Sequence, residues 1–572
     1  MIERIETDVL VLGAGGAGLC AALHAADASP RLDVTVVVKG LLGRAGCTRM
    51  VQGGYNAVLT EPDSLEAHLL DTLKGGGWIN DQELAWTLVT ESPKRVLELE
   101  WRYGCAFDRH ADGRIHQKPF AGQTHDRTIH KGDLTGIEIM NRLTEQAHAR
   151  VNVRALEECR AVELLLDDAG RAAGALVLEM RTGRFVAVHA GATLLAMGGG
   201  PTMYRVFACS ADKSSDGIAL AWAAGVPLRD MEMIQFHPTG LVIPGSLMTG
   251  ALLEEGLRGA GGFLLNGAKQ RFMPQYDPLA ERATRDFVSR AMYSEMRKGH
   301  TTPHGGLYIS MAHLGAEKVR RDFKGMVERC ADCGFDLAGG LVEVVPTAHY
   351  MMGGVEFAAD CSTALPGLFV AGEDSGGVHG ANRLGGNGVA NSTVFGAVAG
   401  DTMAQWVQGR GMHAADESVI AAAVDACERP FRNRAPANLE ALREKLYDTM
   451  WHKVGIIRDA AGLDQARAEL AALDAELDTG GLADGQRAFN LTWHDWLNLK
   501  SLVSVSGAIA AAAAARRDSR GAHFRADFPE PGALEESAFT SLRMIEGTLS
   551  VSTKPVSFTR VRPGETLLKN AA

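Results

Sequence analysis

Three glycines near the N-terminus are spaced as in a phosphate-binding turn. They form Gly13-x-Gly15-x-x-Gly18, which follows an apolar run at residues 9–12 and precedes an alanine-rich stretch at residues 19–26. In such a turn Gly13 permits the tight bend, Gly15 lets a pyrophosphate approach the backbone, and Gly18 lets a helix pack closely on the sheet. The pattern therefore predicts dinucleotide binding at the start of a helix.

The next predicted strand ends in a cation where many dinucleotide folds carry an acid. Residues 33–38 read Asp-Val-Thr-Val-Val-Val and are followed by Lys39. An acid at that place would bind the ribose hydroxyls, so the kind of dinucleotide has to be inferred from other residues. Asp216 opens a further predicted helix and could hold the ribose, with a plain helix N-cap as the alternative. The glycine-rich segment 42–57 is predicted to be a loop over the ligand.

The nine cysteines are scattered through the chain, and Cys330-Ala-Asp-Cys333 is the only close pair. A single Cys-x-x-Cys is weak evidence for zinc, so we expect two free thiols and predict no metal site. We expect no cleavable signal ahead of the first strand. Reduced thiols and a cytoplasmic location are therefore expected.

Length and charge limit the class of protein. The 572 residues exceed one usual hydrophobic core, so two or three domains are expected. The formal net charge of -11 argues against a nucleic-acid surface and favours small-molecule ligands. The nearest approach to a membrane span is the short alanine-rich stretch 505–515, so we expect no transmembrane segment.

Hydrophobic spacing indicates an α/β region broken by an insertion and followed by helices. A strand at 365–371 resumes after glycine-rich loops at 237–349, which suggests a cofactor domain split by that insertion. The predicted helices are 63–73, 81–103 with Asp81 as N-cap, 134–149, 216–226, 286–298, 464–477 and 493–517, and the predicted strands are the short ones in 151–196 and two in 542–561.

Ten ordered motifs make the sequence resemble one family over nearly its whole length. They are the glycine turn, Gln52-Gly53-Gly54, 120–123 (Phe-Ala-Gly-Gln), 235–240 (Gln-Phe-His-Pro-Thr-Gly), 255–259 (Glu-Gly-Leu-Arg-Gly), 284–286 (Thr-Arg-Asp), 349–354 (His-Tyr-Met-Met-Gly-Gly), Gly372-Glu373, 379–387 (His-Gly-Ala-Asn-Arg-Leu-Gly-Gly-Asn) and 519–523 (Ser-Arg-Gly-Ala-His). The sequence resembles the flavoprotein subunit of succinate dehydrogenase and fumarate reductase, together with the related L-aspartate oxidase.

The resemblance implies FAD as cofactor and an α/β fold. It implies a split FAD-binding Rossmann-like domain (1–236 and 350–410), an inserted α+β capping domain (237–349), a C-terminal helical domain (411–541) and a tail (542–572). The cofactor-binding residues that it implies are Gly13, Gly15, Gly16, Ala17, Gly18, Lys39, Gly46, Cys47, Thr48, Gln52, Gly53, Gly54, Asp216, Gly372, Glu373, Arg383, Gly388 and Val389.

The resemblance also implies hydride transfer between a flavin and a carbon–carbon bond flanked by carboxylates. Such chemistry needs groups that bind the carboxylates and a proton donor on the face opposite the flavin. The implied carboxylate-binding residues are His237, His349 and Arg383, of which Arg383 can hold a carboxylate bidentately. Phe120 lies in an implied substrate-binding motif.

Arg285 matches the residue that looks like the family's proton donor, with Glu255 and Arg258 as its relay to solvent. A free guanidinium effectively never deprotonates, so Arg285 can act only through concerted delivery via Glu255 or through a pKa lowered by cationic neighbours. The alternative is a structural Arg285 paired with Asp286.

Three departures from the family matter. Cys47 stands where members with covalent flavin carry a histidine, so FAD is expected to be non-covalent, with a cysteinyl bond as the alternative. Glu254 stands where the family has a threonine that helps bind one substrate carboxylate, and an acid there would repel it. The segment 240–255 is longer than in the respiratory subunits and closer to aspartate oxidase.

Alternative functions remain open from the sequence. A dicarboxylate oxidoreductase of the succinate/fumarate type is supported by residues 120–123. An L-aspartate oxidase or a related amino-acid or carboxylate oxidase is favoured by Cys47, by the longer segment and by Glu254, which could meet an ammonium group. An electron-transfer subunit without its own chemistry, and a nicotinamide-dependent dehydrogenase, fit less well. The expected partners are a small carboxylate and an iron–sulfur or other electron-acceptor subunit, through which the chain could sit peripherally on the inner membrane.

Overall fold

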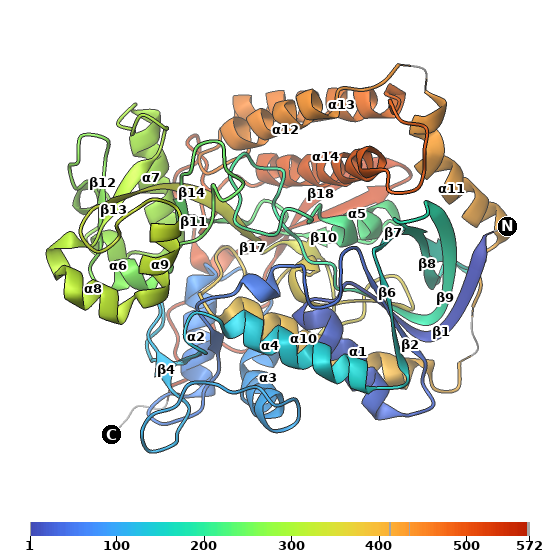
Figure 1. Cartoon of the computed structure of the whole chain (residues 1–572), viewed down its shortest axis with the longest axis horizontal. Helices are drawn as coiled ribbons and strands as arrows, with labels where there is room; N and C mark the ends of the chain where they lie inside the picture. Colours follow the sequence, from blue (N-terminus) through green and yellow to red (C-terminus); the bar gives the residue numbers. More distant parts are fainter. Residues whose placement is uncertain (1, 411–412, 434, 569–572) are drawn as a thin grey trace.

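The computed structural model describes residues 2–410, 413–433 and 435–568, and within these the strands form four sheets. Figure 1 separates a lobe with helices α6 to α9 on the left from the main sheet near the N-terminus and from a layer of helices along the top. The predicted α/β class is confirmed.

The largest sheet carries the glycine turn. Its order is β6-β2-β1-β9-β8-β7, with β16 also paired to β9, and β6, β2, β1, β9 and β16 run parallel. Strand β1 ends in four fully buried residues, 9–12, as expected for a central parallel strand. The bounds are β1 Glu3–Leu12, β2 Val34–Val38, β6 Val153–Glu157, β7 Cys159–Leu166, β8 Ala172–Glu179, β9 Arg184–Leu195 and β16 Leu368–Val370.

Two helices, one of which begins in the glycine turn, cover one face of this sheet. Helix α1 (Gly16–Ala28) follows β1 and packs against α10 (Asn387–Val407), which follows β16. The backbone amide of Ala371, one residue past β16, donates to the Leu195 carbonyl at the end of β9. Residues on both sides of the insertion therefore build one cofactor region, as predicted.

The insertion contains a four-stranded antiparallel sheet in the order β11-β14-β13-β12. The composition of this stretch predicts only loops and short helices, whereas the α+β insertion implied by the resemblance agrees with the sheet. Strands β12 and β13 are only three and four residues long, too short for an alternating pattern to show. The bounds are β11 Ile234–Leu241, β12 Phe263–Leu265, β13 Leu307–Ser310, β14 Leu341–Met351, α6 Gly256–Gly259, α7 Arg285–Arg297, α8 Ala316–Asp322 and α9 Lys324–Asp332.

The remaining strands form two smaller sheets, in the orders β15-β10-β17-β18 and β3-β5-β4. The predicted terminal hairpin is present but begins earlier, and it turns at Glu546 and Gly547, which both have positive φ. The bounds are β3 Tyr55–Asn56, β4 Gln117–Lys118, β5 Thr128–Ile129, β10 Leu228–Arg229, β15 Gly354–Val355, β17 Ala538–Ile545, β18 Thr548–Pro555, α2 Leu65–Gly75, α3 Gln82–Trp101, α4 Thr135–Ala149, α5 Asp216–Ala223, α11 Glu417–Arg432, α12 Leu439–Lys453, α13 Ala460–Thr479 and α14 Leu491–Ala515.

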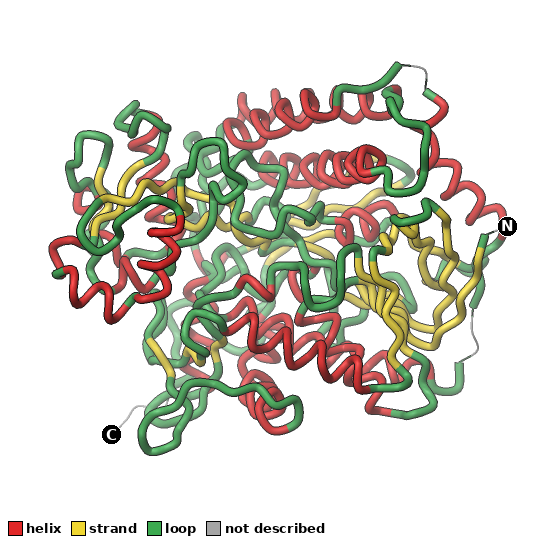
Figure 2. Tube along the Cα trace, in the orientation of Figure 1, coloured by secondary structure: helices red, strands yellow, loops and turns green. Residues whose placement is uncertain are grey.

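Helix α14 is long and apolar enough to cross a membrane by length and composition, which our sequence reading had excluded. In the structure 67% of its apolar window is buried inside the protein. Figure 2 places this helix within the layered C-terminal region, between other helices and strands. It has the character of a core helix.

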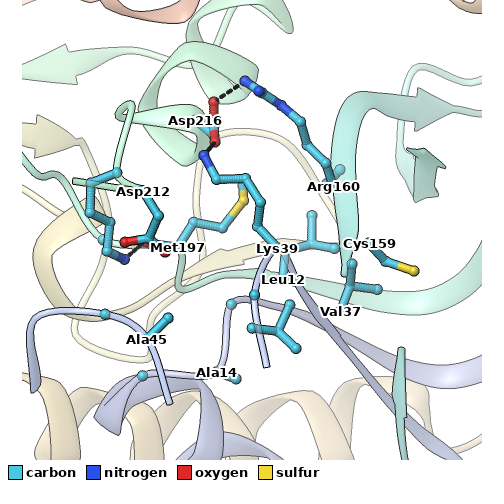
Figure 3. Close-up of a pocket in the computed structure, with 18 of the residues that line it drawn as sticks. Leu12, Ala14, Val37, Lys39, Ala45, Cys159, Arg160, Met197, Asp212 and Asp216 are labelled. Atoms are coloured by element: carbon cyan, nitrogen blue, oxygen red, sulfur yellow. Dashed lines mark hydrogen bonds and ion pairs between the residues drawn. The ribbon is translucent and has the colours of Figure 1, made fainter. Parts of the chain in front are cut away.

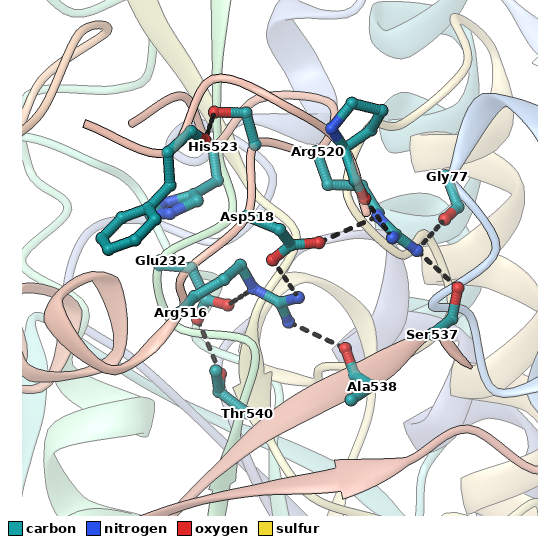
Figure 4. A network of polar contacts seen from close by, with 12 residues as sticks. Gly77, Glu232, Arg516, Asp518, Arg520, His523, Ser537, Ala538 and Thr540 are labelled. Atoms are coloured by element: carbon teal, nitrogen blue, oxygen red, sulfur yellow. Dashed lines mark hydrogen bonds and ion pairs between the residues drawn. The ribbon is translucent and has the colours of Figure 1, made fainter. Parts of the chain in front are cut away.

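A buried network of charges joins the end of α14 to the rest of the protein (Figure 4). Arg516 donates to the Glu232 carboxylate at 2.5 Å, and Thr540 of β17 donates to the same carboxylate at 2.7 Å. Arg520, four residues on, donates to the Gly77 carbonyl at 3.1 Å. These contacts fix the C-terminal helices against the segment that leads into β11.

Candidate active site

The glycine turn is shaped to receive a phosphate. A Cβ on Gly13 would lie 2.2 Å from the Ala196 carbonyl oxygen, and one on Gly18 would lie 1.9 Å from the Gly13 carbonyl oxygen. Gly15 is open, since its nearest atom would be Thr48 Oγ1 at 3.5 Å. The N-cap residue Gly15 has no side chain, and the first turn of α1 carries no acid. The Gly16 amide donates to Thr48 Oγ1 at 3.1 Å, which leaves the other amides and the dipole at this helix end available to an anion. These features fit a dinucleotide.

A small cavity of about 60 Å³ adjoins the turn (Figure 3). Lys39 Nζ lies 3.0 Å from one carboxylate oxygen of Asp216, and Arg160 Nη2 lies 2.6 Å from the other. Burial opposes ionisation, but Arg160 and Lys39 prevail and lower the pKa of Asp216. Lys39 and Asp216 are thus brought together as partners, and the Asp216 side chain does not cap α5.

A cavity of about 1200 Å³ continues from the turn toward the inserted sheet. Burial and the neighbouring Cys47 raise the pKa of Glu373 in its wall to about 8. Of the predicted cofactor residues, all but Gly18 line one or both cavities: Gly13, Gly15, Lys39, Gly46 and Asp216 the small one, and Gly15, Gly16, Ala17, Cys47, Thr48, Gln52, Gly53, Gly54, Gly372, Glu373, Arg383, Gly388 and Val389 the large one.

Two buried histidines face each other at the far end of the large cavity. The His237 ring on β11 and the His349 ring on β14 are 5.7 Å apart. Burial and the nearby arginines hold the pKa of both imidazoles well below its usual range. The backbone amide of Thr239 donates to His237 Nδ1 at 3.3 Å, so the neutral ring carries its proton on Nε2. Both rings are therefore neutral hydrogen-bond donors.

Arg383 comes to the same place from the loop before α10. Its guanidinium lies over the Tyr350 ring at 4.4 Å, and its Nε has no hydrogen-bond partner within the described residues. Burial and the Arg285 charge lower the pKa of Arg383 to about 10, so it is still a cation at neutral pH. Within the described residues Arg383 pairs with no carboxylate, and a buried cation of this kind that lines a cavity is suited to hold one.

Arg285, Glu255 and Arg258, for which the resemblance implies a proton relay, lie together as a buried chain of charged side chains. Arg285 Nη2 lies 2.6 Å from Glu255 Oε2, and Arg258 Nη2 lies 3.8 Å from Glu255 Oε1. Burial alone would raise the pKa of Glu255, but the charges of Arg285 and Arg258 outweigh burial and lower it. The alternative pairing of Arg285 with Asp286 is wrong, because Asp286 instead accepts from Thr284 and Asn382.

Gln235 joins two arginines of the site, a role that the motif 235–240 does not predict. Its amide oxygen accepts from Arg285 Nη1 at 3.1 Å and from Arg383 Nη2 at 3.0 Å. Its amide nitrogen donates to Asn382 Oδ1 and to the Arg383 carbonyl, both at 2.8 Å. The two-residue period of a strand, which sets Gln235 beside His237, is the signal that could have identified it.

Glu254 is bound to a cation that the sequence reading also missed. Lys118 Nζ on β4 lies 2.8 Å from Glu254 Oε1, so this acid has a partner from the cofactor region. Phe120 packs against the loop 42–57, where a Cβ on Gly53 would meet its ring at 2.5 Å, and Lys118 Nζ lies 5.7 Å from the centre of that ring. No local pattern in the polar stretch 117–133 indicated this ion pair.

Comparison with known proteins also indicates a dinucleotide cofactor. A family model described as FAD binding domain matches residues 8–389, and one described as fumarate reductase flavoprotein C-term matches residues 443–567. The chain is 40% identical to a subunit of the CoM/CoB fumarate reductase of Methanothermobacter marburgensis over 92% of this chain and 95% of that protein. It is 36% identical to the fumarate reductase flavoprotein subunit of Mycobacterium tuberculosis, over 98% and 99%. A solved structure of Escherichia coli quinol fumarate reductase has a TM-score of 0.92 and 32% identity over 99% of each chain.

Proposed function

The chain belongs to the fumarate reductase and succinate dehydrogenase flavoprotein family, and we propose that it interconverts a saturated dicarboxylate and its unsaturated counterpart, with fumarate the first substrate to test. It is an FAD-dependent oxidoreductase. The observation that carries the proposal is the buried set of His237, His349, Arg383 and Arg285 at the end of the cavity that starts at the glycine turn.

Carboxylate binding falls to three of these residues. Arg383 offers its positive charge and its Nε–H, which has no partner within the described residues, and the neutral imidazoles of His237 and His349 donate N–H groups without adding charge. Donors fixed in a dry site need no reorganisation as charge develops on the substrate. Bound FAD supplies hydride exchange with the substrate carbon.

Arg285 delivers the proton to the other carbon in this proposal. Its pairing with Glu255 at 2.6 Å lets a proton that the Glu255 carboxylate has taken up pass to the guanidinium as the guanidinium gives one to the substrate carbon, so a free neutral arginine is never formed. Arg258 stabilises the Glu255 carboxylate and continues the path outward, donating to the Glu281 carbonyl at 2.8 Å.

We propose that FAD is held without a covalent bond, because Cys47 stands at the position of the histidyl linkage. Acid precipitation should release yellow FAD into the supernatant. Flavin fluorescence that stays on the denatured polypeptide would refute this, and its loss in Cys47→Ala would identify a cysteinyl bond.

The partner and location are likewise proposals. The names of similar proteins speak of quinol and of a subunit, so we propose a partner chain that donates or accepts electrons, of iron–sulfur or another type. Through it the chain would lie peripherally at the cytoplasmic side of the inner membrane. We propose domain boundaries at 236/237, 349/350, 410/411 and 541/542. The first two lie within the paired strands β11 and β14.

The experiment separates dicarboxylate from amino-acid chemistry. Enzyme reduced anaerobically with dithionite is mixed with fumarate, and the return of flavin absorbance is followed; the same preparation is assayed in air for peroxide with L-aspartate. We expect reoxidation by fumarate and no peroxide, because Lys118 already occupies the Glu254 carboxylate that an ammonium group would need. Peroxide with L-aspartate and no response to fumarate would overturn the proposal.

A further inference from the structure

The two cavities of the cofactor region meet at a lysine for which the motifs give no role. Within the described residues, Gly15, Gly198 and Lys213 line both the small and the large cavity. Gly15 is the glycine of the turn that lets a pyrophosphate approach the backbone. Lys213, in the segment between β9 and α5, therefore lies where the phosphates of a bound dinucleotide are expected. The proposed dicarboxylate chemistry does not use it.

Two glycines make room for the Lys213 side chain. A Cβ on Gly200 would lie 2.4 Å from Lys213 Cβ, and a Cβ on Gly198 would lie 2.9 Å from Lys213 Nζ. A Cβ on Gly46, in the loop 42–57, would lie 4.0 Å from the same Nζ. The Lys213 side chain therefore runs along the segment 198–200 and brings its ammonium close to the loop 42–57, along a path that side chains at 198 and 200 would block.

Lys213 is held both at its backbone and at its tip. Its backbone amide donates to the Ser210 carbonyl at 3.1 Å, and its carbonyl accepts from Thr202 Oγ1 at 2.8 Å. Its Nζ donates to the Met197 carbonyl, which is its one side-chain hydrogen bond within the described residues. An ammonium group has three N–H donors, so two remain for a ligand.

The charge of Lys213 has no carboxylate partner in the protein. Three cations line the small cavity: Lys39, Arg160 and Lys213. Lys39 and Arg160 both form ion pairs with Asp216 (Figure 3). Lys213 forms no ion pair with a carboxylate within the described residues, because its ammonium is bound to a backbone carbonyl instead. Of these three cations, Lys213 is the one left for an anionic ligand.

Negative groups around Lys213 keep it protonated. Burial alone would lower the pKa of Lys213, but the neighbouring negative groups, Cys47 and Asp212 foremost, outweigh burial and raise it. Asp212 itself accepts a hydrogen bond from Ser210 Oγ. The Lys213 ammonium therefore carries a full positive charge at neutral pH.

We propose that Lys213 binds the pyrophosphate of FAD, together with the amides at the start of α1. The helix end supplies roughly half an elementary charge, whereas a pyrophosphate in a dinucleotide carries one negative charge on each phosphate. Lysine binds phosphate as a point charge, so its ammonium can reach an oxygen of either phosphate without a fixed fork geometry. This inference rests on the FAD cofactor of the family and not on the identity of the substrate.

The first test measures how tightly the holoenzyme holds FAD. Purified protein is diluted stepwise, and free FAD is read from its fluorescence, which gives a Kd without turnover. Lys213→Met should raise this Kd at least about tenfold, as for the loss of a hydrogen bond to a charged group, and Lys213→Arg should restore most of the affinity. Lys74→Met is the matched control, since Lys74 is exposed in the last turn of α2 and lines neither cavity; it should leave the Kd unchanged.

Phosphorus NMR of the same holoenzymes tests the contact itself. The two ³¹P resonances of bound FAD should move in Lys213→Met and stay in place in Lys74→Met. This measurement decides alone where FAD does not dissociate, and Lys213→Gln gives the same comparison if the methionine variant does not fold. Unmoved phosphorus resonances, or a Kd equal to that of the wild type, would overturn the proposal. Neither readout involves fumarate, so such a failure would leave the dicarboxylate chemistry untouched.

Discussion

Replacing Gln235 by Glu should abolish tight dicarboxylate binding while leaving the fold intact. The amide oxygen of Gln235 accepts from Arg285 and Arg383 at 3.1 and 3.0 Å, so a carboxylate there would pair with both cations. A substrate carboxylate on the far edge of the Arg383 guanidinium would then lie roughly 6 Å from the new charge. At an effective dielectric constant of about 20 the repulsion is about 3 kcal/mol, or about 100-fold in Kd.

The assay is titration of the oxidised enzyme with a competitive dicarboxylate, followed through the flavin spectrum. Gln82→Glu is the matched control, since Gln82 is equally buried and its amide oxygen also accepts two N–H groups, from Arg560 at 2.8 Å and Val561 at 3.1 Å. The control should bind like wild type. Wild-type affinity in Gln235→Glu, or equal loss in both variants, would refute the reasoning that Gln235 keeps Arg383 free for substrate.

Three further outcomes are expected. Arg383→Lys keeps the charge but loses the planar fork, so dicarboxylate binding should weaken by about 1.5–3 kcal/mol while the flavin stays reducible at high substrate; an unchanged Kd would contradict it. Lys118→Met should raise KM at least about tenfold, because the unpaired Glu254 carboxylate repels the substrate, and the double variant with Glu254→Gln should return KM to the wild-type value. Equal KM in the wild type, the single variant and the double variant would contradict this role of the Lys118–Glu254 pair. Because the pKa of His349 is held well below 6.5, KM should not change between pH 6 and 8 and should fall only at lower pH, where the ring becomes protonated. A change in KM near pH 6.5 that is lost in His349→Asn would contradict this.

Local patterns were enough to predict the elements that carry the cofactor turn. The strand β1, the turn and helix α1 follow from an apolar run and three glycines whose spacing has one physical use. The inserted sheet could not be predicted in the same way, because β12 and β13 are too short for alternation to be visible.

Long-range partners are the part of the site that the sequence does not reveal. His237, Arg285 and Arg383 were identified by motifs, yet the glutamine that joins both arginines was not, since its contacts span 50 and 148 residues. The same holds for Lys118 with Glu254, which are 136 residues apart.

The most direct measurement is the single-turnover reoxidation of anaerobically reduced enzyme by fumarate in a stopped-flow instrument, for the wild type and Arg285→Ala. Proton transfer by a positioned group typically contributes about 10²–10⁴-fold, so the rate at saturating fumarate should fall by about that factor in the variant. The Kd for a competitive dicarboxylate should stay nearly the same, because Arg285 is already bound to Glu255 and acts in the transition state. If Arg285→Ala keeps most of the wild-type rate, or loses affinity alone, Arg285 is not the proton donor and the account of the site is wrong.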